Sequence, residues 1–186
     1  MSNFLSPYRD NYPSNVEKYN THLAPPLDGY NDNQRLSRNL TLGEIRKASS
    51  VVDGEVNLFT YIPLDKRLIN AFQALRNALN APIVVNSAFR SERHEKKQGR
   101  DGTSQHTYGA ALDLRGSGLV ELVKEALSTK NKLYQTLRAI GVNGFGVYEN
   151  DNFIHIDVRQ PKSDGGYAYW EGDEDDELKK KEALHL

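Results

Sequence analysis

The stretch Ser104-Gln105-His106-Thr107-Tyr108-Gly109-Ala110-Ala111-Leu112-Asp113-Leu114 decides how this chain is expected to fold and where its chemistry lies. It places a histidine shortly before a glycine, and an aspartate inside an apolar run. Residues 110–115 have the alternation of a strand, with Leu112 and Leu114 on one face and Asp113 on the other. A carboxylate buried among apolar side chains is costly when unpaired, so Asp113 predicts a cation or strong hydrogen-bond donors beside it.

A second patch, Phe153-Ile154-His155-Ile156-Asp157-Val158-Arg159, has a related pattern. Its even-numbered residues are apolar and should pack on the core, whereas His155, Asp157 and Arg159 share the opposite strand face. Taken alone, this is the pattern of any half-solvated strand, and His106 alone is an ordinary loop histidine. The two patches therefore need to be considered together.

His106, Asp113 and His155 together favour a metal site over those ordinary explanations. Two neutral imidazoles and one carboxylate form a ligand set for tetrahedral zinc with the fourth position open, which is typical of catalytic zinc sites. Zinc polarises a carbonyl and lowers the pKa of a bound water to about 7, chemistry that suits amide hydrolysis. Because the sequence has no cysteine, any metal must be held by nitrogen and oxygen ligands.

Four segments in the same order resemble a known family. Ser104-x-His106-x-x-Gly109-x-Ala111-x-Asp113 resembles the signature of the zinc D-Ala-D-Ala carboxypeptidases and L-Ala-D-Glu endopeptidases. Ser87-Ala88-Phe89-Arg90-Ser91 resembles the family's Ser-Gly-Tyr-Arg-Ser segment, and residues 144–148 with 153–157 resemble its final hairpin. The Thr41-Leu42 opening and a helix over 65–80 complete the likeness, which covers about residues 40–160 and is closest to the murein endopeptidase and phage endolysin branch.

The resemblance implies both a fold and a set of site residues. The fold is α+β, a mostly antiparallel sheet with flanking helices, as in lysostaphin-type enzymes and the hedgehog signalling domain. His106, Asp113 and His155 would be the zinc ligands. Arg90 would bind the substrate carboxylate or stabilise the oxyanion, its alternative being a surface arginine before a charged helix. Ser104 would hydrogen-bond near the substrate or support its own loop.

The chain departs from the family pattern at the general base. Many members carry an acid three residues before the last histidine, where this chain has Asn152. Asp157 is therefore the candidate, either acting through a water molecule or orienting the ligand histidine from behind. Asp151 and Glu149, in the preceding turn, are weaker candidates.

Local signals predict the remaining elements of an α+β domain. A capping box at Thr41 and Glu44 predicts a short helix to about Ser49. An apolar stripe predicts the helix over 65–80, Ser91 and Ser117 are expected to cap two further helices, and Gly141 to end another. Ile83 to Val85 reads as a buried strand.

The chain divides by composition into three parts. Residues 1–39 are expected to form an extended arm that wraps the domain, is disordered on its own, or docks on a protein partner. Residues 40–162 are expected to form the zinc peptidase domain, and residues 163–186 a charged tail. Trp170, with Tyr167 and Tyr169, either anchors that tail on the domain or lines one side of the cleft.

Charge and hydropathy restrict the partners and the location. A net charge of −1 gives no electrostatic case for nucleic acid, and the basic run near residues 90–100 is balanced by acids. No apolar run is long enough to insert into a membrane, and residues 1–10 lack the pattern of a signal peptide, so a soluble protein is expected.

The leading hypothesis is thus a zinc peptidase, endopeptidase or carboxypeptidase, acting on peptidoglycan stem or cross-link peptides. Its expected setting is a phage endolysin in the host cytoplasm before holin-mediated release, or a virion part. The competing hypothesis is a zinc-binding structural or binding module without turnover, for example a virion component, which Asn152 and the tyrosine-rich arm motivate.

Overall fold

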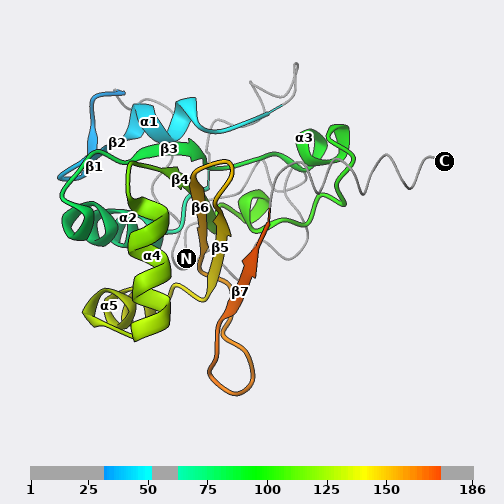
Figure 1. Cartoon of the computed structure of the whole chain (residues 1–186). Coiled ribbons are helices and arrows are strands. Elements are labelled where there is room, and N and C mark those ends of the chain that lie inside the picture. The colour runs from blue at the N-terminus through cyan, green and yellow to red at the C-terminus, as the bar shows by residue number, and fades with distance from the viewer. Residues whose placement is uncertain (1–31, 52–62, 173–186) are drawn as a thin grey trace, which may run out of the picture.

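A five-stranded sheet forms the centre of the molecule (Figure 1). The computed structural model describes residues 32–51 and 63–172. The strand order is β3-β4-β6-β5-β7, and all neighbours are antiparallel except β5 and β7, which run parallel. The strands span β3 Val84–Ser87, β4 Ala111–Arg115, β5 Gly144–Tyr148, β6 Phe153–Asp157 and β7 Ala168–Glu171. A small antiparallel pair, β1 Arg35–Ser37 and β2 Leu40–Thr41, lies apart from this sheet.

Five α-helices surround the sheet in the described part of the chain. In Figure 1, α2, α4 and α5 lie to one side of β5 and β6, and α3 lies to the other. The helices are α1 Leu42–Lys47, α2 Lys66–Leu79, α3 Glu92–Lys97, α4 Leu119–Thr129 and α5 Lys132–Ile140, with a 3-10 turn over Gln105–Tyr108. The predicted α+β architecture with a mostly antiparallel sheet is confirmed.

Four of the five described α-helices begin at a side-chain cap, and α4 is the exception. The capping box predicted at Thr41 is present, because its hydroxyl accepts from the Glu44 amide while the Glu44 carboxylate accepts from the Thr41 amide. The prediction that Ser117 caps a helix is wrong. Helix α4 instead begins after Gly118, whose left-handed backbone (φ 78°) lets the chain turn into the helix without a side-chain cap.

The two central strands separate the core from the site. Leu112 pairs with Ile156 and Leu114 with Ile154, and all four side chains are buried on the core face. Burying each such side chain stabilises the fold by about 1.5–3 kcal/mol. On the same register Asp113 pairs with His155. The pairing that fills the core therefore also places polar residues of both patches side by side on the other face.

The two edges of the sheet differ from expectation. Strand β3 is an edge strand rather than a buried one, and Val84 is 62% exposed. Strand β7 was not expected, since residues 168–171 fall within the stretch predicted as a charged tail. The division into arm, domain and tail stays a prediction, and residues 1–31 and 173–186 lie outside the described ranges.

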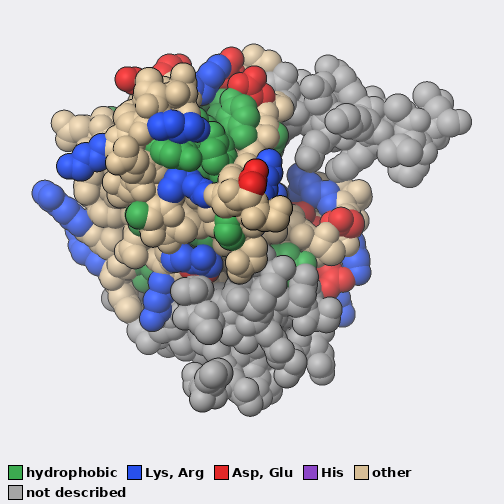
Figure 2. Space-filling view, turned by 90° about the horizontal axis from the view of Figure 1, so that it is seen from below, with side chains coloured by type: hydrophobic (Ala, Val, Ile, Leu, Met, Phe, Trp, Pro, Cys, Tyr) green, Lys and Arg blue, Asp and Glu red, His purple; other side chains and the backbone are tan. Residues whose placement is uncertain are grey.

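The surface shows no single field of charge on the face drawn in Figure 2. Lys and Arg side chains there are spread among uncharged and hydrophobic ones rather than gathered into one continuous patch. Within residues 32–51 and 63–172, no helix has the length and apolar character needed to cross a membrane.

Candidate metal centre

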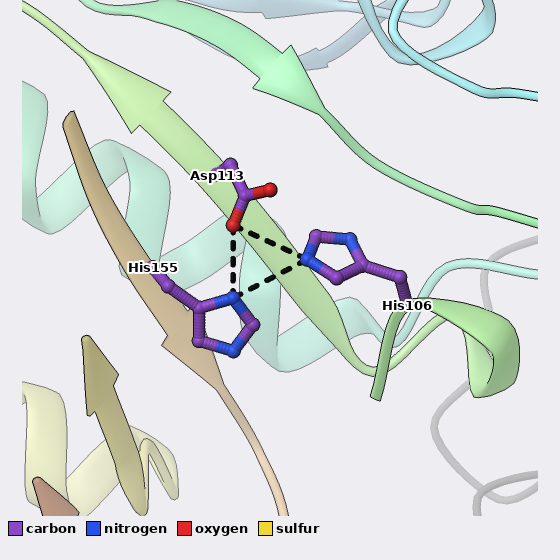
Figure 3. Close-up of side chains that lie close together, drawn as sticks. All are labelled: His106, Asp113 and His155. Atoms are coloured by element: carbon purple, nitrogen blue, oxygen red, sulfur yellow. Dashed lines mark hydrogen bonds and ion pairs between the residues drawn. The ribbon is translucent and has the colours of Figure 1, made fainter. Parts of the chain in front are cut away.

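His106, Asp113 and His155 meet in a small triangle of ligand atoms (Figure 3). Nε2 of His106 lies 3.2 Å from Oδ1 of Asp113 and 3.2 Å from Nδ1 of His155, and the last two atoms are 2.8 Å apart. Ligands about 2.0–2.2 Å from a tetrahedral ion are separated by about 3.3 Å, so the triangle is close to the size a metal needs. All three side chains are buried.

The outer nitrogens of both rings are already committed to acceptors. Nδ1 of His106 donates to the carbonyl of Ala88 at 2.6 Å, and Nε2 of His155 donates to Oδ2 of Asp157 at 3.1 Å. Each ring thereby turns the lone pair of its inner nitrogen toward Oδ1 of Asp113. Three mutually facing acceptors need a cation between them, and the donor set therefore fits a metal ion.

Without a metal, a proton takes the cation's place. Burial alone would lower the pKa of His155, but hydrogen bonds to Asp113 and Asp157 raise that pKa to about 9. The pKa of His106 is lowered, chiefly by burial. For Asp113, burial would raise the pKa, yet the charges and hydrogen bonds of the two histidines hold it well below its usual value. The triangle thus retains a carboxylate and one positive charge.

Asp157 lies behind His155 rather than in front of it. Its side chain is fully buried, and Arg159 donates to it through Nε at 2.8 Å and Nη2 at 2.5 Å. Burial would raise the pKa of Asp157, but bonds from His155 and Arg159 lower it to about 2. Of the two predicted roles, this geometry favours orienting the ligand histidine over taking a proton from a water molecule.

Two glycines of β5 make room on the site face of the sheet. A Cβ on Gly144 would lie 2.2 Å from Oδ2 of Asp157, and one on Gly146 would lie 2.6 Å from the ring of Trp170. Both distances are closer than real Cβ contacts allow. The alternation Gly-Phe-Gly-Val therefore serves two faces, since Phe145 and Val147 fill the core on the opposite side.

Arg90 contacts a candidate ligand directly. Its Nη2 donates to Oδ2 of Asp113 at 2.5 Å and its Nε to Oγ of Ser87 at 2.8 Å. Its Nη1 lies 3.6 Å from Oε1 of Glu95. The side chain is 17% exposed, so it is not the surface arginine of the alternative explanation. Arg90 borders the cavity described below while it orients Asp113.

Ser104 and the turn residues occupy different places. Ser104 borders the cavity, and its hydroxyl lies 3.2 Å from that of Thr107, so its position suits both roles predicted for it. Asn152, Asp151 and Glu149 do not border the cavity. Glu149 instead pairs with Lys124, and the carbonyl of Asp151 accepts from Arg115.

The triangle opens into a cavity of about 390 Å³ with two unlike walls. One wall is charged and comes from the segment containing α3 and the following loop, with Arg90, Glu95 and Arg100. The other is aromatic and comes from Tyr148, Phe153 and Trp170. The ring centroids of Trp170 and His155 are 5.2 Å apart. Nε1 of Trp170 donates to the Tyr148 hydroxyl at 2.9 Å.

Sequence reasoning missed several residues of these walls. The sequence leaves Trp170 between anchoring the tail and lining the cleft, and in the structure the strand β7 that carries it pairs with β5 and also borders the cavity. Glu95 and Arg100 were read as part of a balanced charge run. A signal for Trp170 existed in Gly146, because a glycine on the polar face of a strand marks the close approach of another group.

Comparison with known proteins supports the metal centre independently. A family model described as Peptidase M15 matches residues 38–157, and that range contains all three side chains of the triangle together with Arg90, Ser104 and Asp157. No match was found among curated proteins.

Proposed function

Because the chain belongs to the peptidase M15 family, we propose that it is a zinc-dependent peptidase that hydrolyses peptide bonds of bacterial peptidoglycan. The observation that carries the proposal is the buried triangle of His106, Asp113 and His155 at the floor of an open cavity. Its two imidazoles and one carboxylate are the ligand set of a catalytic zinc with an open position. Zinc, when bound, would supply Lewis acidity to the scissile carbonyl and activate a water molecule.

The residues of the chain would prepare that chemistry in distinct ways. Asp157 holds His155 by its outer nitrogen and keeps the inner lone pair aimed at the ion. The Ala88 carbonyl does the same for His106, and Arg90 fixes the second oxygen of Asp113. The aromatic residues Tyr148, Phe153 and Trp170 border the cavity and would exclude water from one side of a bound peptide.

The test is digestion of purified cell wall by the zinc-loaded protein. We expect new amino termini to appear, and we expect a chelator or His106→Ala to abolish them. Mass spectrometry of the released fragments would identify the bond and distinguish endopeptidase from carboxypeptidase action. Intact wall after incubation with protein that has been shown to contain zinc would refute the proposal.

The orientation of Asp157 is a specific observation in favour of the competing hypothesis, a zinc-binding module without turnover. Asn152 is not an acid, and Asp157 is sealed behind His155, so neither predicted position presents a base to the cavity. A structural zinc module would bind one ion and melt at a higher temperature with it, yet leave every wall peptide intact. Turnover by the zinc-loaded protein would exclude that alternative. The phage setting stays a prediction.

A further inference from the structure

Glu95 is a buried acid whose contacts lead back to the metal centre. It lies on α3, and its side chain is fully buried. Its Oε1 lies 3.6 Å from Nη1 of Arg90 and accepts from Nη1 of Arg100 at 3.2 Å. Within the described residues its other oxygen, Oε2, has no hydrogen-bond partner. A buried carboxylate with an unpaired oxygen costs free energy, so Glu95 is a candidate for a role other than stability.

The backbone fixes the position of Glu95 relative to Arg90. Helix α3 begins directly after Ser91, whose hydroxyl accepts from the His94 amide and whose carbonyl accepts from the Glu95 amide. The Arg90 amide donates to the carbonyl of His106 at 3.3 Å. The start of α3 is therefore tied to a candidate ligand of the metal, and Glu95 lies on the turn of helix that follows Arg90.

Arg90 lies between two carboxylates. Its Nη2 donates to Oδ2 of Asp113 at 2.5 Å, its Nε donates to Oγ of Ser87 at 2.8 Å, and its Nη1 faces Glu95. The other oxygen of Asp113, Oδ1, faces the inner nitrogens of the two histidines at 3.2 Å and 2.8 Å. Glu95, Arg90 and Asp113 thus form a row of alternating charge that ends at a candidate ligand atom.

A guanidinium beside a metal ligand weakens a metal site in two ways. Its positive charge repels a divalent cation, and its hydrogen bond draws on the negative charge of the ligand carboxylate. A second carboxylate on the far side of the guanidinium opposes both effects, because the cation then interacts with two anions. Glu95 occupies that position relative to Arg90, and its burial leaves the interaction little screened by salt.

We propose that Glu95 is a positioning residue of the metal centre, which holds Arg90 between two carboxylates and thereby raises the affinity of the triangle for zinc. The proposal rests on the metal site of the function proposed above and assumes nothing about the peptide. Glu95 acts at a distance, through Arg90 on Asp113.

Zinc titration in competition with a chromophoric chelator tests the proposal. Glu95→Gln keeps the size of the side chain and removes its charge. We expect zinc affinity to fall about tenfold, the lower end of the loss that follows when a group holding a metal ligand is removed. The control is Glu92→Gln on the same helix, where Glu92 pairs with Lys96 away from the cavity. The control should bind zinc like the wild type, and equal affinity in Glu95→Gln would overturn the proposal.

A double-mutant cycle with Arg90→Gln tests the route of the effect. In that background Glu95→Gln should change zinc affinity by less than about twofold, because the guanidinium through which Glu95 acts is gone. A loss as large as in the wild-type background would show that Glu95 acts on the ion directly by its charge. That result would overturn the positioning role.

Arg100→Gln separates the contact with Arg90 from the support of the loop after α3. The variant removes a positive charge and leaves the pair of Glu95 and Arg90 in place, so zinc affinity should stay unchanged or rise. A loss equal to that of Glu95→Gln would mean that the acid acts by holding the loop, which contradicts the proposal.

Glu95→Asp keeps the charge and shortens the side chain by one methylene, so it tests position and also serves if Glu95→Gln does not fold. We expect a loss of zinc affinity smaller than that of Glu95→Gln, in a protein whose melting confirms that it is folded. Wild-type affinity in Glu95→Asp would show that the position of the carboxylate does not matter and would overturn the assignment.

The titration separates this proposal from the peptidase function because it uses no peptide. Protein that binds zinc and leaves cell wall intact would refute the peptidase, while a loss of affinity in Glu95→Gln would still support the role of Glu95. A wild-type protein that binds no zinc would refute the metal centre and the role of Glu95 together.

Discussion

The floor of the cavity and its aromatic wall are built from the same sheet by different means. Two of the three floor residues come from neighbouring antiparallel strands, β4 and β6, whose register places Asp113 opposite His155, and His106 comes from the 3-10 turn before β4. The wall depends on β7, which pairs parallel to β5 after a long connection. The floor is specified by short patterns that a reader can recognise in the sequence. The wall is specified by a pairing between distant segments, which leaves only indirect traces.

The largest effect is expected from a change to Asp157, which holds the floor residue His155 in place. Asp157→Asn should lower metal affinity or activity by about 10- to 100-fold, because the amide cannot hold the outer nitrogen of His155 as a carboxylate does. Metal titration and initial rates measure the two quantities. The matched control is Asp151→Asn in the turn, which should leave both unchanged. Equal losses in the two variants would show that Asp157 has no special link to the metal.

The protonation of the floor gives a pH dependence of metal binding. Since the pKa of His155 is raised to about 9 in the metal-free protein, a metal must displace a proton at neutral pH. Apparent affinity should therefore rise with pH, by about tenfold per unit, and level off above about 9. Competition with a chromophoric chelator measures it. A metal affinity that stays constant between about pH 6 and about pH 8 would mean that the His155 imidazole is already neutral in the metal-free protein.

A smaller effect is expected when the wall is displaced. In Gly146→Ala the new methyl group would overlap the ring of Trp170, so the ring must move away from His155. Overpacking of this kind costs about 1–3 kcal/mol of stability. We expect KM for cell-wall peptide substrates to rise several-fold, while the affinity for the metal stays unchanged. Denaturant unfolding, metal titration and kinetics separate the three readouts, and an unchanged KM would show that the wall does not contact substrate.

The smallest effect lies outside both regions. Thr41→Ala removes the hydroxyl of the capping box on α1 and should reduce the free energy of unfolding by about 1 kcal/mol. Metal affinity and kcat/KM should stay at wild-type values, because α1 does not border the cavity. A change in either quantity would mean that the cap and the site are energetically linked.

These differences indicate how much could be predicted from the sequence. Alternation fixed which residues of β4 and β6 face the core, and that requirement alone turned Asp113 and His155 to one side. The expected capping box and helix stripe were also local, and both are present. The positions of Glu95 and Arg100 depend on how a loop folds back over α3, for which a charge run gives no pattern. The edge position of Val84 likewise depends on strand order.

The place of β7 in the chain has a consequence for how selectivity can change. The family match ends at residue 157, whereas Arg159 and Trp170 lie beyond it. The ligand triangle and the Trp170 part of the aromatic wall are therefore encoded in consecutive portions of the sequence, although Tyr148 and Phe153 of that wall lie within the matched range. Exchanging residues 158–172 among related chains offers a way to recombine one hydrolytic centre with new peptide preferences while its ligand set is left intact.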